Sequence, residues 1–335
     1  MRSLLFILAA LSAAPTPADE LPMDQRPLDQ QPPAERADIR AFIDDMAKKH
    51  GFDRDALLAT FAQVQLRQKV VDSITRPAEA KPWHAYRPIF VTDTRIEEGV
   101  AFWNENSALL KRAQEEYGVP PEIIVAILGV ETRYGRQKGG YRVIDSLATL
   151  AFNYPQRGDF FRSELEQYLL LTREEGLDPL AIIGSYAGAM GKAQFIASSY
   201  RRYAVDFDED GTRDLWNNNA DAIGSVANYF QRNRWQPGGM VTTRVEANGE
   251  QIPSLVGMGI KPHTPMAQLR IQGVMPEADI QPEELASLIQ LETVDGPEYW
   301  LGLNNFYVIT RYNRSPLYAM AVYQLGQAIL ARING

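Results

Sequence analysis

The chain has 335 residues, of which 45% are hydrophobic and 23% are charged, and it contains no cysteine. It carries 42 acidic against 34 basic residues, which gives a net charge of -8, and no basic run or stripe appears. This composition excludes disulfides, a thiolate nucleophile and a lipidated cysteine, and it argues against a nucleic-acid partner. Three scattered histidines (His50, His84 and His263) argue against a histidine-rich metal site. The hydrophobic content is sufficient for a large core in two or three lobes.

The N-terminus has the pattern of a secretory signal. Arg2 precedes the apolar run LLFILAAL, and small residues follow through Ala18. The run is too short to span a bilayer, and no later stretch is long enough to anchor the chain. We therefore expect an exported, soluble protein with a signal peptide at 1–18 and a flexible, proline-rich leader at 19–34.

The following segment has helical periodicity. A first helix is expected from Arg36 with Gly51 as its end, and a second helix with Asp53 as its cap. Residues 75–93 contain three prolines and three aromatic residues and predict an ordered loop. The pair Thr94 and Glu97 forms a capping box that predicts one long helix ending at Tyr117. Further helices are expected over 120–135, 145–152, 159–175, 192–203, 221–231 and 318–330, the last with Ser315 as its cap and Pro316 at its first position.

After Trp235 the pattern changes to short strands. The stretch VTTRVEANGE alternates apolar and polar residues into a turn at Asn248 and Gly249. Further strands are expected over 288–292 and 306–310. These features predict a small β-rich lobe inserted into a helical body.

Glu131 lies in the expected helix 120–135, which begins at a pair of prolines. Leu128, Ile127 and Ile124 precede it by three, four and seven positions, so the carboxyl shares the apolar face of its helix. Burial there would raise the pKa, giving an acid that can hold its proton near neutral pH and donate it to a leaving group. A buried glutamate satisfied by a neighbouring Arg or Tyr for structural reasons explains this helix equally well.

The segment 184–191 (GSYAGAMG) holds six Gly, Ala or Ser residues in eight positions. This composition indicates a close approach of the backbone to a ligand or to another helix. Close packing within the protein is the more common of these two explanations.

The stretch DFDEDGTRDLWN has the pattern of a calcium loop between two expected helices. Asp206, Asp208 and Asp210 stand at positions one, three and five, and Gly211 stands where the loop turns sharply at six. Thr212 offers a carbonyl at position seven, and Asp214 stands at position nine. At position twelve, Asn217 replaces the usual glutamate. Asp221 is the nearest carboxylate that could complete the coordination shell. Because nothing reactive lies inside the loop, calcium would be structural, and an acidic surface turn is the alternative.

Aromatic faces beside planar polar groups are typical of sugar-binding clefts. Each such residue alone is more often part of a core, but together with a solitary buried acid they suggest a glycan cleft. The candidates are Trp83 and Tyr86, residues 153–157, Ser185, Gln194, Tyr229, and Tyr312 with Asn313 and Tyr318.

An ordinary glycoside hydrolase needs a second carboxylate. The nearby acids are Asp145, Asp159 and Glu164, and a helix cap or a solvent-facing position explains each of them. The chemistry that fits one acid is substrate-assisted: Glu131 protonates the glycosidic oxygen, the N-acetyl group of the substrate stabilises the cationic carbon, and Glu131 then acts as the base. No Ser/His/Asp arrangement or phosphate loop competes with this interpretation.

Five ordered motifs resemble the lytic murein transglycosylases of the membrane-bound B type, over a region from about Arg36 to the C-terminus. The motifs are GVETRYG (129–135), SLATLAFNYPQR (146–157), GSYAGAMGKAQF (184–195), YAVDFDEDG (203–211) and DAIGSVANYF (221–230). The resemblance implies cleavage of the β-1,4 bond between N-acetylmuramic acid and N-acetylglucosamine in peptidoglycan, by attack of the muramyl 6-hydroxyl, which leaves a 1,6-anhydro end.

The resemblance also implies roles for individual residues. The catalytic glutamate of the family falls on Glu131. The positions that contact glycan fall on Tyr86, Arg157, Ser185, Gln194, Tyr229, Asn313 and Tyr318, and the calcium positions fall on Asp206, Asp208, Asp210, Thr212 and Asp221.

The chain departs from the family pattern at two points. The membrane-bound type carries a lipidated N-terminal cysteine, which is absent here, so we expect a soluble periplasmic relative. Gln156 and Arg157 stand where many members have two arginines, which affects contacts to the peptide or the muramyl group. Glycan strands are the expected partner, and the sequence does not identify which cell-wall synthases or amidases accompany the enzyme.

The implied fold is mainly α, a lysozyme-like helical core with an N-terminal helical lobe and a small β-rich lobe. We expect an N-terminal helical lobe at 35–119, a catalytic core with the calcium loop at 120–235, a β-rich lobe at 236–298 and a return to the core at 299–335. Two rival functions remain: a muramidase that adds water to the same bond, and a non-catalytic scaffold that binds peptidoglycan. The intact GVETRYG motif argues against the scaffold.

Overall fold

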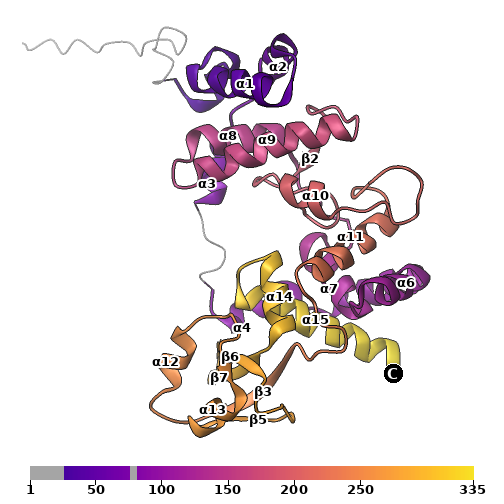
Figure 1. The fold of residues 1–335 in the computed structure, drawn as a ribbon, viewed down its shortest axis with the longest axis vertical. Helices are drawn as coiled ribbons and strands as arrows, with labels where there is room; N and C mark the ends of the chain where they lie inside the picture. The colour runs from indigo at the N-terminus through magenta and orange to yellow at the C-terminus, as the bar shows by residue number, and fades with distance from the viewer. Residues whose placement is uncertain (1–25, 76–80) are drawn as a thin grey trace, which may run out of the picture.

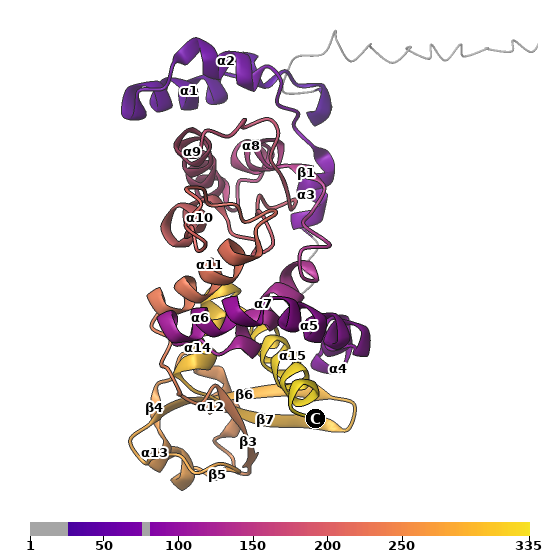
Figure 2. The same ribbon diagram turned by 90° about the vertical axis from the view of Figure 1, so that its right-hand side faces the viewer.

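The computed structural model describes residues 26–75 and 81–335 (Figure 1). The expected signal peptide at 1–18 and much of the expected leader at 19–34 lie outside these residues. The described chain is mainly helical with one small antiparallel sheet, as the sequence predicts. Its parts are stacked along the long axis as an upper lobe, a lower helical body and a β lobe (Figures 1 and 2).

The upper lobe is built from two separate stretches of chain, residues 26–75 and 141–203. Two caps in the first stretch form as predicted: Gly51 closes α1 in the left-handed region, and the Asp53 carboxylate accepts a hydrogen bond from the Ala56 amide at 2.8 Å. The elements are η3 (Leu28–Gln30), η4 (Pro33–Glu35), α1 (Ala37–His50), α2 (Arg54–Phe61), α3 (Gln68–Ile74), β1 (Tyr141–Arg142), α8 (Val143–Asn153), α9 (Gly158–Glu174), β2 (Ile183–Gly184) and α10 (Ala197–Tyr203).

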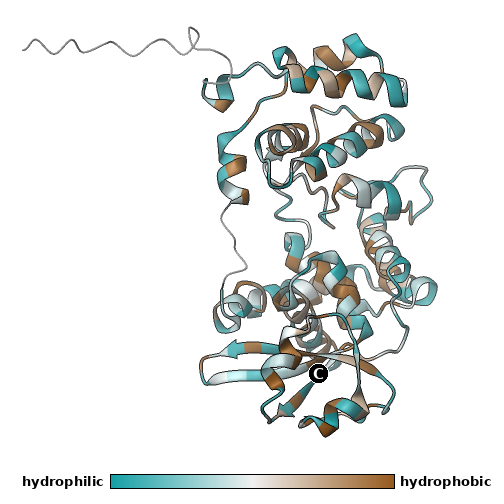
Figure 3. Ribbon diagram, turned by 60° about the vertical axis from the view of Figure 1, so that its left-hand side comes forward, coloured by the Kyte–Doolittle hydropathy of each residue, from teal (hydrophilic) through white to brown (hydrophobic). Residues whose placement is uncertain are grey.

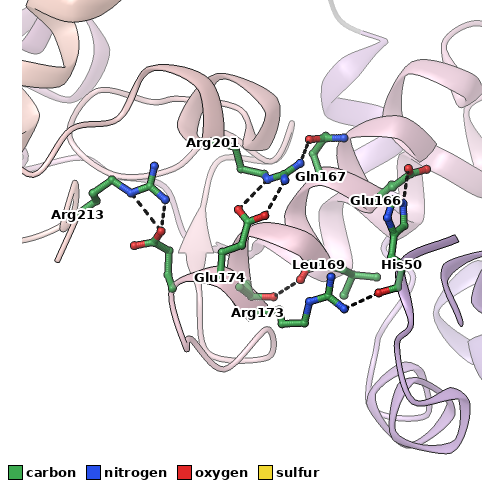
Figure 4. Close-up of polar contacts among 10 residues, drawn as sticks. His50, Glu166, Gln167, Leu169, Arg173, Glu174, Arg201 and Arg213 are labelled. Atoms are coloured by element: carbon green, nitrogen blue, oxygen red, sulfur yellow. Dashed lines mark hydrogen bonds and ion pairs between the residues drawn. The ribbon is translucent and has the colours of Figure 1, made fainter. Parts of the chain in front are cut away.

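Apolar residues of α1 and α2, among them Ile39, Phe42 and Leu57, are buried, and hydrophilic residues alternate with hydrophobic ones along both helices (Figure 3). Polar contacts tie the middle and the C-terminal end of α9 to its neighbours (Figure 4). Glu166 lies 2.8 Å from the imidazole of His50, and Arg173 donates to the His50 carbonyl at 2.8 Å. Arg201 of α10 forms a two-point ion pair with Glu174. The two contacts of His50 join the two stretches that make up the lobe, and the Arg201 pair joins α9 to α10 within the second stretch.

The lower body surrounds the helix that carries Glu131. Helix α7 packs against α5, α6, α11 and α15, and α15 also contacts α4 and α14. The Ser315 hydroxyl caps α15, as predicted. The body consists of α4 (Trp83–Phe90), α5 (Asp93–Glu105), α6 (Ser107–Tyr117), α7 (Pro121–Thr132), α11 (Asn219–Arg232), α14 (Asn304–Tyr312) and α15 (Pro316–Asn334).

Three expectations about these elements were wrong, and a fourth was right in part. The loop expected at 75–93 contains helix α4, in which Pro88 is accommodated near the C-terminal end. The long helix expected from Thr94 is two helices that meet at Asn106, and its cap is the Thr92 hydroxyl. The strand expected at 306–310 is part of α14. The helix expected at 192–203 is confirmed over its C-terminal half, as α10, but the residues before it form turns.

The β lobe is a five-stranded antiparallel sheet with strand order β4-β6-β7-β3-β5. Strands β6 and β7 form a hairpin in which Thr293 pairs with Gly296, and the expected strand at 288–292 lies within β6. The lobe has a small core of its own, separate from the core of the helical parts. Its elements are β3 (Thr242–Ala247), α12 (Ile252–Gly257), β4 (Thr264–Pro265), α13 (Met266–Ile271), β5 (Val274–Pro276), β6 (Leu285–Thr293) and β7 (Gly296–Gly302). Within the described residues, none of the helices has the length and apolar character needed to cross a bilayer.

Candidate active site

Glu131 lies in the last turn of α7, whose other residues from Ile123 to Val130 are all buried. Glu131 as a whole residue is half-buried, so part of it reaches the surface beside apolar neighbours. Burial disfavours the charged form and raises the pKa of Glu131 to about 7, although a hydrogen bond from Tyr318 acts in the opposite direction. The side chain can therefore carry a proton near neutral pH.

Tyr318, in the first turn of α15, is the residue placed directly on this acid. Its hydroxyl donates to Glu131 Oε1 at 2.5 Å, and the side chain is buried. Burial, with the nearby Glu131, raises the pKa of Tyr318 well above its ordinary value, so the phenol stays protonated. Tyr318 can thus donate a hydrogen bond to Glu131 when the carboxyl group becomes ionised.

The chain turns sharply after Glu131. Arg133 and Tyr134 both adopt left-handed backbone conformations (φ 51° and 59°), which are strained for residues with side chains. Arg133 forms a two-point ion pair with Glu98 of α5 at 2.5 and 2.7 Å, and the Tyr134 hydroxyl donates to the Arg95 carbonyl at 2.8 Å. These contacts with α5 hold the strained turn and fix the end of the helix that carries Glu131.

A second tie joins α7 to the loop 184–195. The Thr132 hydroxyl donates to the Lys192 carbonyl at 2.8 Å and accepts from the Gly135 amide at 2.9 Å. The small residues of the loop serve close packing, since a Cβ on Gly184 would lie 2.2 Å from the Ala189 carbonyl oxygen. Of the two explanations for this segment, packing within the protein is the one that the structure shows.

An aromatic cluster lies next to Glu131. The Tyr312 hydroxyl donates to the Ala193 carbonyl at 2.5 Å, and its ring packs against Tyr229 at 4.8 Å and Phe195 at 5.8 Å. The Tyr229 hydroxyl donates to the Arg311 carbonyl at 2.5 Å. Burial, with the nearby Glu131, raises the pKa of Tyr312 well above its ordinary value. The cluster thus joins α11, α14 and the loop 184–195 around the acid.

The remaining predicted glycan residues lie on several elements. Tyr86 of α4 is buried between Trp83 and Phe90, and the Arg157 guanidinium lies 4.3 Å from the centroid of the Phe160 ring. The Ser185 hydroxyl accepts hydrogen bonds from the amides of Ala187 and Ala189, Gln194 donates to the Gly191 carbonyl at 3.0 Å, and Asn313 follows the end of α14. Among these positions, Ser185 and Gln194 share the loop that Thr132 ties to α7.

The other acids near Glu131 in sequence are already engaged or exposed. Asp145 and Glu164 are buried, contrary to the expectation of caps or solvent-facing positions for them. Asp145 accepts a two-point contact from Arg142, Glu164 accepts from the Ser198 hydroxyl and amide, and Asp159 is exposed. Among the described residues, no other carboxylate affects the pKa of Glu131. This arrangement suits chemistry that is carried out by a single acid.

The candidate metal loop gathers three carboxylates. Single oxygens of Asp206, Asp208 and Asp210 lie within 4.8 Å of one another. Thr212 donates through its amide and hydroxyl to Asp210, and Asp221 is fully buried, with its two oxygens accepting from the amides of Phe207 and Asp214 at 2.7 Å. Burial raises the pKa of Asp221, and the charges of Asp206 and Asp208 add to this. Clustered carboxylate oxygens suit a hard divalent cation such as calcium.

Three features of the site were not found by sequence reasoning. The Glu98–Arg133 ion pair joins residues 35 positions apart, and no periodicity indicates such a pair. Lys192 donates to the Asn217 carbonyl at 2.8 Å and to the Asn219 side chain, and thereby links the metal loop to the loop 184–195. Arg67 and Arg142 both lie against Asp145. The only sequence signal for these contacts was that Arg133 lies in the motif GVETRYG and Lys192 lies in the motif GSYAGAMGKAQF.

Comparisons with known proteins identify relatives of this chain. The sequence model of the transglycosylase SLT domain matches residues 34–327. The membrane-bound lytic murein transglycosylase B of Escherichia coli (strain K12) is 47% identical over 312 residues, which cover 90% of this chain and 85% of that protein.

Several solved structures share the fold, including the following two. The soluble lytic transglycosylase SltB1 of Pseudomonas aeruginosa is 48% identical with a TM-score of 0.84, over 88% of this chain and 99% of that one. The Escherichia coli lytic transglycosylase Slt35, solved in complex with calcium, is 46% identical with a TM-score of 0.82, over 90% of this chain and 94% of that one. These matches confirm the expected lysozyme-like, mainly helical fold. The chain therefore belongs to the transglycosylase SLT domain family.

Proposed function

We propose that this protein is a peptidoglycan lytic transglycosylase that cleaves the β-1,4 bond between N-acetylmuramic acid and N-acetylglucosamine. The observation that carries the proposal is the lone Glu131, whose pKa burial raises to about 7 and whose carboxyl group contacts the Tyr318 hydroxyl. A single acid of this pKa can donate and later accept a proton near neutral pH. The close relatives support the reaction class.

In the first step, protonated Glu131 gives its proton to the glycosidic oxygen, and the bond from that oxygen to the muramyl anomeric carbon breaks. The N-acetyl group of the same sugar stabilises the positive charge that develops on this carbon. The Tyr318 hydroxyl donates to the carboxylate that remains. Such a hydrogen bond to the ionised form favours proton release.

In the second step, the Glu131 carboxylate takes the proton of the muramyl 6-hydroxyl. The oxygen of this hydroxyl attacks the anomeric carbon and closes a 1,6-anhydro ring. The net reaction adds no water, and Glu131 ends in the protonated form in which it began. No second carboxylate is needed, which agrees with the surroundings of Glu131.

We assign glycan contacts to the residues that the sequence predicted. Planar amide and guanidinium groups can hold sugar hydroxyls, and aromatic faces can cover the apolar sides of the rings. The assigned residues are Tyr86, Arg157, Ser185, Gln194, Tyr229, Asn313 and Tyr318.

We assign a structural calcium ion to Asp206, Asp208 and Asp210, with Thr212 and Asp221 completing the site. The three clustered carboxylates support this assignment, and one close relative was solved in complex with calcium. When bound, the ion would neutralise a concentration of negative charge and hold the loop after α10. None of the residues that would bind it takes part in bond cleavage.

We further propose that the protein is exported and acts in the periplasm, with residues 1–18 as its signal peptide. The apolar run after Arg2 supports this proposal. Cell fractionation of a tagged full-length protein, with N-terminal sequencing of the mature chain, tests both parts of it. An uncleaved chain in the cytoplasmic fraction would contradict the proposal.

Digestion of purified sacculi followed by mass spectrometry tests the proposed reaction. The wild-type protein should release fragments that end in 1,6-anhydro-N-acetylmuramic acid, each lighter by one water than a hydrolysis product. Products with the mass of hydrolysed fragments would identify a muramidase, and binding to sacculi without release of fragments would identify a scaffold. Glu131→Gln should bind sacculi and release almost nothing.

A further inference from the structure

A second candidate site lies in a cavity of about 500 Å³ between α3, β1 and the start of α8. Its walls contain the cations Arg67, Lys69 and Arg142 against the anions Asp29 and Asp145. The local charge is therefore positive, in a chain whose net charge is -8. This concentration of cations requires an explanation.

The internal needs of the protein use part of this positive charge. Asp145 is buried, and its carboxylate accepts from Arg142 at 2.8 and 2.9 Å and from the Gln65 amide at 3.0 Å. Arg67 adds a longer contact of 3.5 Å to the same carboxylate. Since Arg142 already satisfies the Asp145 charge, Arg67 is largely in excess, and the Arg67 side chain is 46% exposed.

Lys69 is the second cation in excess. It is exposed on α3, and its ammonium group forms no hydrogen bond or ion pair with any of the residues in 26–75 and 81–335. Asp29, the remaining anion of the wall, is also exposed. Two cations therefore face this cavity with donors to spare, which suits a ligand that carries carboxylate groups.

The cavity is adjacent to the proposed glycan contacts. Ile183 of β2 lines it, and Ser185, an assigned glycan contact, is two residues farther along the chain. Residues two apart in an extended chain are separated by about 7 Å. A peptide attached to a sugar near Ser185 covers about 10 Å with three extended residues and so reaches the cations. Ile183 and Tyr141 supply apolar wall for small aliphatic side chains.

We propose that this cavity binds carboxylate groups of the stem peptide that peptidoglycan carries on its muramyl sugars. The proposal rests on the proposed function, because it takes the glycan strand to lie along the Ser185 loop. It makes the protein selective for strands that retain their peptides. Arg67 and Lys69 carry this preference.

The test compares binding of two ligands, glycan strands with stem peptides and the same strands after enzymatic removal of the peptides. Binding is measured by isothermal titration in the Glu131→Gln background, so that the strands stay intact. Adding Arg67→Gln and Lys69→Gln together should weaken binding of peptide-bearing strands by about three- to tenfold, as expected for two exposed charge contacts. Binding of peptide-free strands should stay as in the parent.

Two further variants keep the result interpretable. Lys48→Gln with Lys49→Gln removes the same charge from an exposed part of α1 and should leave both affinities unchanged. Lys69→Gln alone cannot disturb Asp145 and should give a smaller loss in the same direction. Equal weakening for both ligands, no weakening for either, or no binding of either ligand overturns the proposal. A wild-type protein that binds both strands but forms no anhydro products would contradict the proposed reaction. That result would not contradict the proposed peptide site.

Discussion

The properties of Glu131 follow from its position at the end of a buried helix. Its neighbours on α7 exclude water, and the buried Tyr318 hydroxyl supplies a single donor. The first effect raises the pKa and the second lowers it, with about 7 as the result. A carboxyl group in this balance is poised to act as an acid and then as a base.

Activity should therefore depend on pH through Glu131. The protonated form starts the reaction, so turnover should fall as the pH rises through about 7. Tyr318→Phe removes the donor that favours the carboxylate, so the pKa of Glu131 should rise further above its ordinary value. In a profile of kcat against pH, the fall in kcat on the alkaline side should occur at a higher pH in this variant than in the wild type. A fall in kcat at the same pH as in the wild type, or at a lower pH, would contradict the role given to Tyr318.

The same shift predicts a cost in stability. Because the pKa of Glu131 is higher in the folded protein than its ordinary value of 4.5, the folded state binds more protons between these two values. The associated stability is present below pH 4.5 and is lost as the pH rises through about 7. Glu131→Gln should therefore be more stable than the wild type by roughly 1–3 kcal/mol at pH 8, and the gap should close toward pH 4.5. Urea unfolding at the two pH values measures it, and a gap independent of pH would contradict this account.

At the level of elements, the site depends on how α5 holds the end of α7. Glu98 is only 12% exposed and pairs with Arg133 and Arg136. Ion pairing with Arg133 lowers the pKa of Glu98, so this carboxylate remains ionised at neutral pH. The pair acts on a backbone turn that is otherwise unfavourable.

Glu98→Gln should weaken catalysis without removing any group that contacts the substrate. The Arg133 turn would lose its ionic partner, and the Glu131 carboxyl group would be held less firmly. We expect kcat to fall by about tenfold with little change in KM. Glu97 is an exposed neighbour on the same helix, so Glu97→Gln is the matched control and should leave kcat and KM unchanged. Equal effects of the two variants would show that the Glu98 contact does not position the acid.

The metal loop predicts a stabilising effect of calcium. A ligand present at 100 times its Kd stabilises the folded state by about 2.7 kcal/mol. Calcium should therefore raise the Tm of the wild-type protein and chelation should lower it, whereas Asp208→Asn with Asp210→Asn should respond to neither. Glu209→Gln changes an exposed acid of the same loop that is not an assigned ligand, and it should keep the response. Differential scanning calorimetry decides, and a wild-type Tm unmoved by calcium or chelator would contradict the assignment.

Elements with local signals were predictable. The Asp53 and Ser315 caps, the Gly51 helix end and the spacing of the aspartates at 206–210 all act within a few residues. The break at Asn106 was missed, because the Asn106 side chain is held by the Phe102 carbonyl and by Asn219, which lies 113 residues away.

Two other errors had a different cause. The segment 306–310 is apolar and rich in β-branched residues, so its pattern could not be told from that of a strand. Proline composition suggested a loop at 75–93, although Pro88 fits near the end of a short helix. In the site, Glu131 was found from its helical spacing, but the contacts that hold it, from Glu98, Lys192 and Tyr318, come from distant parts of the chain.

At the level of the whole molecule, the chain passes from the upper lobe to the lower body, returns, and leaves again (Figures 1 and 2). Neither helical part is therefore a continuous piece of sequence. A protein that begins at residue 120 would lack α5 and α6, against which α7 packs, and α1 and α2 of the upper lobe. We expect such a fragment to show no cooperative thermal transition by circular dichroism, although the β lobe has a core of its own. A sharp transition would show that the region from 120 onward folds independently.

This interleaving affects the nascent chain during synthesis. His50 contacts Glu166, which lies 116 positions later in the sequence. The first helices therefore cannot pack in their native positions until the segment that they contact has been translated. At 5–20 residues per second the wait is roughly 6 to 23 seconds. This interval is therefore the minimum time for which the apolar side of α1 stays uncovered and available to chaperones that capture unfolded polypeptides.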